Sequence, residues 1–297
     1  MKYAVVIPCK DEEKNVALTL ESLCNQTILP QICIVIDDNS SDNSPHIIEK
    51  YVSKYDFIKL YRLTTTAGYT LGNRVVELFN FGKQIIDDLG ISYDYIVKLD
   101  SDLSFERNLI ERINERIKKE KYGIVSGTPY FLENNVKQVE NNPAWHSKGQ
   151  FKIYNKECLL EIGGIPQSLG WDCADNIRAI EKGWKTVAFP DIQYRMHRRV
   201  GGKFSNGKIN HGLGAYYLGY DFFYLMLRIM AQVHKPPYVM GSVYMLMGYM
   251  KGVINKKDRI LHPNQISILR KLLWGSLYQR LKLKLGGQHE VHPKALN

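Results

Sequence analysis

Tyr95-Ile96-Val97-Lys98-Leu99-Asp100-Ser101-Asp102 is the stretch that decides the fold, because an apolar run ends there directly in two carboxylates. Short apolar runs that are bounded by polar turn residues are typical of buried strands. Four further runs of this kind lie in the first half of the chain, at residues 3–7, 32–36, 58–61 and 123–126. The sequence therefore predicts five buried strands, with acidic residues directly after two of them, at residues 37–38 and 100–102.

The segments between the first of these runs have the spacing of amphipathic helices. Their apolar side chains recur three or four residues apart and form three groups: Val16, Leu20, Leu23 and Cys24; Ile47, Ile48 and Tyr51; Val75, Leu78, Phe79 and Ile86. Strands that alternate with helices indicate βαβ units and a mostly parallel sheet. We therefore expect a Rossmann-like α/β domain flanked by helices, with its ligand site at the C-terminal ends of the strands.

Length and cysteine content restrict the class of protein. A chain of 297 residues buries a sizeable core without disulfides or structural metal. Its five cysteines are widely spaced and contain no Cys-x-x-Cys, which argues against both a disulfide framework and a zinc site. The first apolar run is also too short for the core of a signal peptide. We therefore expect a cytoplasmic protein.

The last part of the chain differs in charge from the rest. The net charge is +10, and most of the basic excess follows residue 250. Residues 238–250 are uncharged but fall short of the ~20 residues that span a bilayer. A later segment places five apolar residues on one face of a basic helix: Ile266, Leu269, Leu273, Leu277 and Leu281. This helix either lies at an anionic membrane surface or packs on the preceding domain.

The changes in charge and in apolar pattern divide the chain into a folded domain over residues 1–235 and a basic helical extension over residues 236–297. The acidic clusters described next fall in two halves of the domain, residues 1–102 and residues 103–235. A basic tail also suits nucleic acid, but we consider that partner less consistent with the acidic clusters described next. An extension that binds membrane would place the protein at the inner face of the membrane.

Three acidic clusters follow predicted strands or open a predicted helix. Asp37 and Asp38 follow residues 32–36, where a turn with a helix cap would also use acidic residues. Two adjacent carboxylates at a sheet edge can in addition accept hydrogen bonds from a nucleobase or a ribose. Asp100 and Asp102 can converge on one divalent cation and leave coordination positions for phosphate oxygens.

The third cluster spans residues 170–175 and contains Asp172 and Asp175 at the start of a predicted helix. An acidic residue at this position often serves only as an N-cap. A carboxylate in a dry cleft with a raised pKa is also suited to act as a general base toward an attacking hydroxyl. The sequence leaves open which of the two carboxylates points into the cleft.

Taken together, these residues resemble the family 2 glycosyltransferases with the GT-A fold. The resemblance covers residues 1 to about 200. Its first half consists of residues 6–13, Asn15, Leu20, Leu23, Gln26-Thr27, residues 34–42, Gly68, Gly72, Asn73, Arg74 and the Asp100-Ser101-Asp102 triplet. Its second half consists of Gly170-Trp171-Asp172, Arg178, Gly183, Pro190-Asp191 and His197.

The resemblance implies that residues 1–235 are a catalytic domain, with a nucleotide-binding half over residues 1–102 and an acceptor half over residues 103–235. It also implies a role for each site residue. The donor sugar nucleotide would be bound by Pro8, Cys9, Lys10, Glu12, Asp38, Arg74, Lys98, Asp100 and Ser101. The cofactor would be Mg²⁺ or Mn²⁺, held by Asp100 and Asp102. His197 would complete that site or touch the diphosphate, or it would serve a structural role. Asp172 would be the base, with Asp175 as the alternative base. The acceptor or the diphosphate would be contacted by Trp171, Arg198 and Arg199.

One position departs from the family pattern, since Trp171 stands where the family usually has Glu. This change removes one acid from the acceptor pocket and offers an indole face on which a sugar ring could stack. The chain also lacks the Gln-x-x-Arg-Trp motif of the processive synthases. Addition of a single sugar is therefore the expected reaction.

The resemblance implies an inverting transfer from a nucleotide-diphosphate sugar of the UDP, GDP or dTDP type. The acceptor would be a carbohydrate or a lipid-linked hydroxyl, in the synthesis of a polysaccharide, a glycolipid or another glycoconjugate. A nucleotidyltransferase with a similar sheet is one alternative, although residues 8–15 lack the glycine-rich signature of that class. A non-catalytic protein that binds nucleotide sugars is the other.

Overall fold

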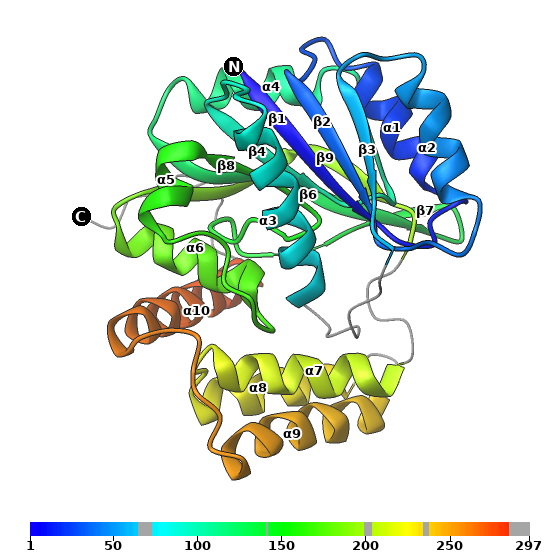
Figure 1. Ribbon diagram of the computed structural model, residues 1–297. Helices are drawn as coiled ribbons and strands as arrows, with labels where there is room; N and C mark the ends of the chain where they lie inside the picture. The colour runs from blue at the N-terminus through cyan, green and yellow to red at the C-terminus, as the bar shows by residue number, and fades with distance from the viewer. Residues whose placement is uncertain (65–72, 141, 199–203, 234–237, 285–297) are drawn as a thin grey trace.

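A computed structural model describes residues 1–64, 73–140, 142–198, 204–233 and 238–284. Within these ranges, the strands form one mixed sheet in the order β3-β2-β1-β4-β8-β6-β9-β5, and β7 pairs with β6 at the side (Figure 1). The parallel part consists of β1 (Tyr3–Cys9), β2 (Ile32–Asp37), β3 (Ile58–Arg62) and β4 (Tyr95–Leu99). All four lie where the sequence predicted strands.

The second part of the sheet is mostly antiparallel and was predicted only in part. It consists of β5 (Leu103–Phe105), β6 (Tyr122–Glu133), β7 (Val136–Val139), β8 (Phe151–Asn155) and β9 (Lys185–Met196). β8 lies between β4 and β6 and is antiparallel to both, whereas β9 runs parallel to β6. The short strands β5 and β7 were missed, because three or four residues are too few to show a period.

Helices cover both faces of the sheet (Figure 1). One face packs against α1 (Val16–Cys24), α2 (Ser44–Val52) and α4 (Leu109–Ile117), and the other against α3 (Asn73–Asp88), α5 (Lys156–Glu161) and α6 (Trp171–Glu181). α1, α2 and α3 carry the apolar faces that the sequence predicted. The two layers hold the sheet in place and leave the C-terminal edge of its parallel strands for the site.

Four further helices lie beside α6: α7 (Phe204–Tyr217), α8 (Phe222–Gln232), α9 (Tyr238–Ile254) and α10 (Pro263–Lys284). The predicted apolar stripe of α10 is buried at Ile266, Leu269 and Leu273, where it packs with Cys173 and Ile177 of α6. Of the two readings of this helix, the structure therefore shows the packed one over these residues. α7 packs closely on α9, so the predicted boundary at residue 235 falls inside a packed unit.

Candidate active site

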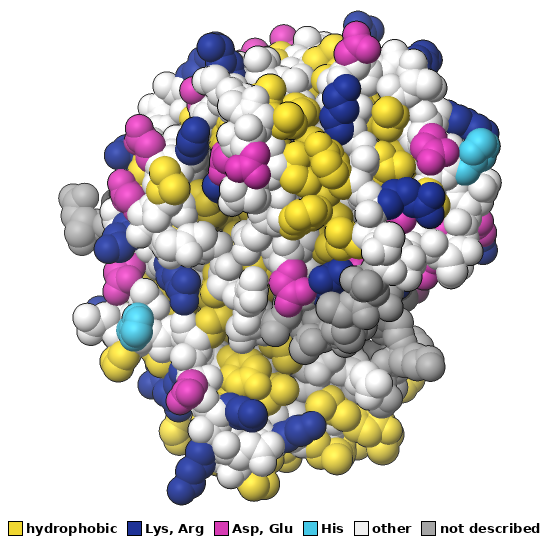
Figure 2. All heavy atoms as spheres, in the orientation of Figure 1, with side chains coloured by type: hydrophobic (Ala, Val, Ile, Leu, Met, Phe, Trp, Pro, Cys, Tyr) yellow, Lys and Arg dark blue, Asp and Glu magenta, His cyan; other side chains and the backbone are white. Residues whose placement is uncertain are grey.

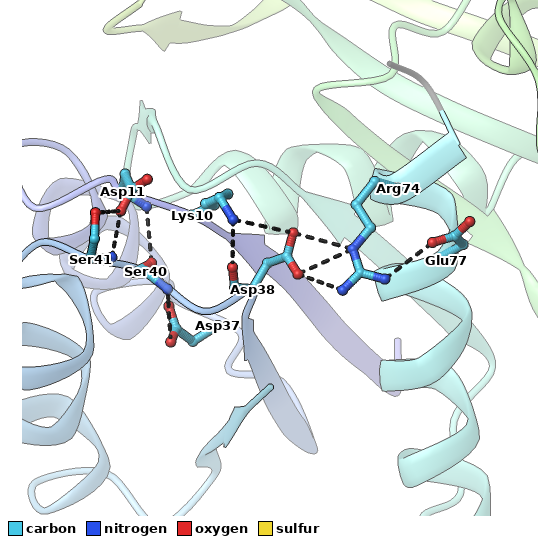
Figure 3. A network of polar contacts seen from close by, with 8 residues as sticks. All are labelled: Lys10, Asp11, Asp37, Asp38, Ser40, Ser41, Arg74 and Glu77. Atoms are coloured by element: carbon cyan, nitrogen blue, oxygen red, sulfur yellow. Dashed lines mark hydrogen bonds and ion pairs between the residues drawn. The ribbon is translucent and has the colours of Figure 1, made fainter. Parts of the chain in front are cut away.

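The first part of the site is a charged network at the C-terminal ends of β1 and β2 (Figure 3). The Arg74 guanidinium donates to both carboxylate oxygens of Asp38, with the Nη2 contact at 2.5 Å and the Nε contacts at 3.1 and 3.2 Å. The Lys10 ammonium donates to the Asp38 carbonyl oxygen at 2.9 Å. Three residues predicted for the nucleoside pocket are therefore in direct contact, although they come from three separate segments of the chain.

The adjacent end of β1 connects this network to the acidic triplet. Cys9 is the last residue of β1, and the side chain of Ser101 lies close to its thiol. Burial raises the pKa of Cys9 to about 12, so the thiol stays protonated. Pro8 precedes it on the strand, in register with Ile36 of β2. Pro8 and Cys9 are therefore buried parts of the strand end beside the site. A buried, protonated thiol is not a nucleophile.

The acidic triplet follows β4, as the sequence predicted. The Lys98 ammonium, from within β4, pairs with the Asp100 carboxylate and also donates to the Gly149 carbonyl at 2.8 Å. Lys98 is almost fully buried, whereas the Asp100 side chain remains 29% exposed. Asp100 therefore keeps part of its carboxylate open toward the solvent side of the sheet edge.

Arg198, beyond the end of β9, connects the triplet to the β1–α1 loop. Its guanidinium lies 2.6 Å from the buried Glu12 carboxylate and 3.3 Å from the Asp102 carboxylate. The Arg198 side chain itself is 66% exposed. Arg199, which was predicted to act beside it, lies outside the described residues, as do Gly68 and Gly72.

The two carboxylates of the triplet are held in an unfavourable electrostatic environment. Burial raises the pKa of Asp100, and the neighbouring Asp102 charge adds to this rise, against the opposing effect of Lys98. Burial also raises the pKa of Asp102, and Glu12 adds to it, against the opposing effect of Arg198. Carboxylate oxygens under such mutual repulsion are the ligands that Mg²⁺ and Mn²⁺ prefer. This pair of residues therefore fits a divalent cation that also takes phosphate oxygens.

His197 does not join this pair. Its Nε2 atom lies 2.8 Å from the Ser104 Oγ atom on the neighbouring strand β5. No group of three or more potential His, Cys, Asp or Glu ligands gathers anywhere in the described ranges. The arrangement supports the structural reading of His197, and Asp100 and Asp102 remain as the two neighbouring carboxylates that follow β4.

Asp172 lies in the first turn of α6, and its side chain is 32% exposed. An Nε2 atom of His146 lies 3.7 Å from its carboxylate. Burial raises the pKa of Asp172, but the nearby His146 imidazole and the ammonium groups of Lys152 and Lys148 outweigh this effect and lower it. The pKa of Asp172 is therefore lowered, and not raised as the sequence-based hypothesis of a general base assumed. The Asp172 carboxylate is ionised at neutral pH.

Asp175 is fully buried and its carboxylate is occupied. The Lys152 ammonium contacts its two oxygens at 2.6 and 2.7 Å, and the Tyr154 hydroxyl donates to one of them at 2.6 Å. Lys152 also donates to the Asp172 carbonyl oxygen at 2.7 Å. This arrangement contradicts the alternative base, because Asp175 has no oxygen facing an acceptor; it instead anchors the first turn of α6.

Trp171 is also buried rather than open to a sugar ring. Its side chain packs in the core, and the ammonium groups of Lys98 and Lys152 lie 5.5 and 5.4 Å from its ring centroid. A Cβ atom on Gly149 would come within 2.9 Å of the Trp171 ring and 3.1 Å of the Asp172 Cβ atom. The stacking surface expected from the sequence is therefore not available, and the indole instead packs against both lysines.

These contacts join the two acidic centres of the site. Lys98 pairs with Asp100 and donates to Gly149, and Gly149 packs directly against Trp171 and Asp172. No role was assigned to Lys152 or to His146 from the sequence. For His146 the available signal was a histidine in a polar loop. For Lys152, which lies inside an apolar strand, the sequence offered no signal.

The first part of the chain is similar in sequence to known proteins. Residues 4–74 match the family model of glycosyl transferase family 2. A cholesterol galactosyltransferase from Borreliella burgdorferi is 30% identical over 142 residues, which cover 46% of this chain and 36% of the relative. The matched part of the chain thus spans little more than a third of that relative's length.

Solved structures show the same fold. The S. aureus TarS fragment in complex with UDP-GlcNAc has a TM-score of 0.56 at 19% identity, with 75% of this chain and 68% of that chain covered. The mannosyltransferase PcManGT from Pyrobaculum calidifontis, in complex with GDP-Man and Mn²⁺, has a TM-score of 0.56 at 12% identity, with 96% and 83% covered. Over residues 4–74 the chain is thus similar to glycosyl transferase family 2, and over most of its length it shares the fold of these two solved structures.

Proposed function

We propose that this chain transfers a single sugar from a nucleotide-diphosphate sugar to an acceptor hydroxyl, with inversion at the anomeric carbon. The observation that carries the proposal is the contact path from Asp100 through Lys98 and Gly149 to Asp172. Asp100 would bind the divalent cation that stabilises the leaving diphosphate, and Asp172 would take the proton of the attacking hydroxyl. The contact path connects these two carboxylates. A single displacement needs both groups in one cleft.

The donor nucleoside would lie over the Asp38, Arg74 and Lys10 network. Asp38 offers acceptor oxygens and Arg74 offers donors, a combination that recognises the polar edge of a base or a ribose. The structurally similar proteins bind UDP-GlcNAc and GDP-Man respectively. We therefore propose a UDP, GDP or dTDP sugar as donor.

Asp100 and Asp102 would hold Mg²⁺ or Mn²⁺, which supplies positive charge to the departing diphosphate when bound. Lys98 fixes the position of the Asp100 carboxylate from below. Arg198 is the exposed cation at the same edge, and its guanidinium can turn from Asp102 to a diphosphate oxygen. Asp100 and Asp102 would thus bind the metal ion, and the exposed Arg198 guanidinium would bind the leaving diphosphate.

Asp172 would act as the general base. As the acceptor oxygen attacks the anomeric carbon, its proton passes to the Asp172 carboxylate, and the bond to the diphosphate oxygen breaks. A lowered pKa keeps Asp172 ionised and ready, at the expense of basicity. His146 lies 3.7 Å from the Asp172 carboxylate on one side, and the exposed 32% of the Asp172 side chain would face the acceptor.

We propose a lipid-linked acceptor in glycolipid or polysaccharide synthesis. α6, which carries Asp172, packs against α7, α8 and α10 through one apolar cluster. These helices expose large apolar side chains, and one relative is a cholesterol galactosyltransferase. The free cysteines and the basic extension support a place in the cytoplasm at the inner face of the membrane.

A transfer assay tests this proposal. The protein is incubated with each of several UDP, GDP and dTDP sugars, Mn²⁺ and a membrane lipid extract, and release of nucleoside diphosphate is measured. We expect release with one donor class, abolished by EDTA, and a product of inverted anomeric configuration by NMR. Release that survives EDTA would contradict the metal role, retention would contradict the single displacement, and pyrophosphate release would indicate a nucleotidyltransferase.

A further inference from the structure

The helix α9 has its two faces reversed with respect to an ordinary surface helix. Its buried positions follow a helical spacing and are mostly small: Gly241, Ser242, Met245, Gly248 and Gly252. Its exposed positions follow the opposite stripe and are large and apolar: Met240, Val243, Met247, Met250 and Ile254. A helix of a water-soluble domain normally buries its large apolar face and exposes its polar one.

The small face of α9 allows close contact with α7. A Cβ atom on Gly248 would lie only 1.9 Å from the Ile209 carbonyl oxygen. A Cβ atom on Gly212 of α7 would lie 1.8 Å from the Met245 carbonyl oxygen. The backbones of the two helices therefore approach until only glycine fits on either side. This explains the orientation of α9, since no other face of the helix could come so close.

Close packing through small residues, with the large apolar side chains turned outward, is characteristic of helices surrounded by lipid. The outward side chains of α9 are well exposed, with Met247 at 54%, Met240 at 50% and Ile254 at 71%. Figure 2 shows hydrophobic side chains gathered along the lower end of the molecule, where α9 lies in Figure 1. In water this stripe would be an unusually large exposed apolar surface.

α9 does not have the dimensions of a membrane span. It comprises 17 residues, and none of the described helices is long and apolar enough to cross a bilayer. A helix of this kind can lie in the plane of the interface with its apolar side in the acyl region. The apolar stripe therefore suits one leaflet surface rather than a full crossing.

Basic residues lie at the end of the same helix. Lys251 is exposed on α9 itself, and Lys256, Lys257 and Arg259 are exposed directly after it, with Asp258 as the one acid of residues 238–259. Basic side chains at the edge of an apolar stripe are complementary to anionic lipid head groups. This combination of apolar area and positive charge favours a lipid surface over a second protein as the occupant.

We propose that the outward stripe of α9, defined by Met240, Val243, Met247, Met250 and Ile254, is a docking surface for an anionic lipid bilayer. The stripe lies in the outer part of one leaflet, and Lys256, Lys257 and Arg259 contact lipid phosphates. The membrane-binding element is therefore α9 rather than the apolar stripe of α10, which is buried on α6 over Ile266–Leu273. This inference does not depend on the sugar-transfer reaction.

Flotation with vesicles tests the proposal without any donor or acceptor. Vesicles of phosphatidylcholine containing about a quarter phosphatidylglycerol provide the anionic surface. We expect wild-type protein to float with them, and V243E/M247E to lose about tenfold or more in partitioning. Leu160→Glu is the matched control, because Leu160 is 64% exposed on α5, away from α9; it should bind like wild type.

A second pair of measurements covers poor folding of the double variant. In wild-type protein, hydrogen exchange of residues 238–254 should slow on addition of vesicles while α5 is unaffected. K256E/K257E changes only exposed side chains after the helix. It should weaken binding to anionic vesicles more than binding to vesicles of phosphatidylcholine alone. Unchanged exchange in α9 together with unchanged flotation of both variants would overturn the proposal. So would a wild-type dimer that V243E/M247E dissociates and that does not bind vesicles.

Discussion

Two acid–cation contacts at the site use similar residues in opposite surroundings. Lys152 and Asp175 are both fully buried, and every oxygen of Asp175 has a partner. Arg198 contacts Glu12 and Asp102 from a position that is 66% exposed. The first contact is closed and holds α6, whereas the cation of the second, the open contact, faces solvent. Burial, and not the type of residue, separates the closed contact from the open one.

Asp102, which contacts Arg198, and its neighbour Asp100 are both in an unfavourable electrostatic environment. Burial and neighbouring acids raise the pKa of Asp100 and Asp102, so their ionised forms destabilise the folded protein. A bound cation would relieve this repulsion. The closed pair, in contrast, has no unsatisfied charge to offer. We therefore expect substitutions in the two regions to separate activity from stability.

The largest effect is expected at the open contact, from Asp102→Asn. The variant loses one of two metal-binding carboxylates, so sugar transfer should fall by about a thousandfold or more. The fold should survive with an unchanged or higher Tm, because a strained charge is removed. Transfer is measured with saturating donor and Mn²⁺, and Tm by differential scanning fluorimetry. Transfer within a few-fold of wild type would exclude Asp102 from the metal site.

Asp172→Asn should have the next largest effect. Loss of the base is expected to lower turnover by about 10²- to 10⁴-fold. The affinity for donor should stay nearly the same, since Asp172 lies on the acceptor side. Turnover and donor affinity are measured separately, by product formation and by calorimetric titration. Weak donor binding with preserved turnover would assign Asp172 to the donor pocket instead.

The closed and open contacts can be compared directly by the same change of cation to Met. Lys152→Met leaves Asp175 buried without its partner, so we expect a loss of about 3–5 kcal/mol in the free energy of unfolding. Arg198→Met removes a cation that is 66% exposed and should cost less than Lys152→Met, because the Asn15 side chain still donates to Glu12. Urea denaturation measures both. Equal costs would show that burial does not distinguish the two contacts.

The smallest effect concerns pH. Because the folded pKa values of Asp100 and Asp102 are raised, the folded state binds protons more tightly than the unfolded chain. Their contribution to stability is therefore present below the ordinary Asp pKa and is lost as pH rises through the raised values. In metal-free buffer, the Tm of Asp102→Asn relative to wild type should increase with pH across this window. A constant difference would contradict the raised pKa values.

The sequence predicted the parallel half of the sheet because each strand there is a continuous apolar run followed by polar residues. Asp38, Asp100 and Asp102 could be placed for the same reason, since position after a strand determines the sheet edge. Arg74 was found through the family resemblance. The pattern was sufficient wherever a residue's role depends on its own segment of chain.

Residues whose role depends on distant partners were predicted less well. Asp172 and Asp175 are three positions apart on one helix, and only Lys152 on β8 determines which of them is buried. Trp171 could be read as a stacking surface because nothing in its own segment shows Lys98 and Gly149 beside it. The reversed orientation of α9 depends on glycines of α7. Such pairings arise from packing between elements and have no local signal.

The central claim is that Asp100 and Asp102 hold a cation which joins the protein to a nucleoside diphosphate. Thermal shift of the wild-type protein with UDP, GDP and dTDP, each with and without Mn²⁺, tests it most directly, because a ligand that binds the native state raises Tm. We predict that one nucleotide raises Tm by several degrees only when Mn²⁺ is present. A rise of the same size without Mn²⁺, or no rise with any of the three, would contradict the account.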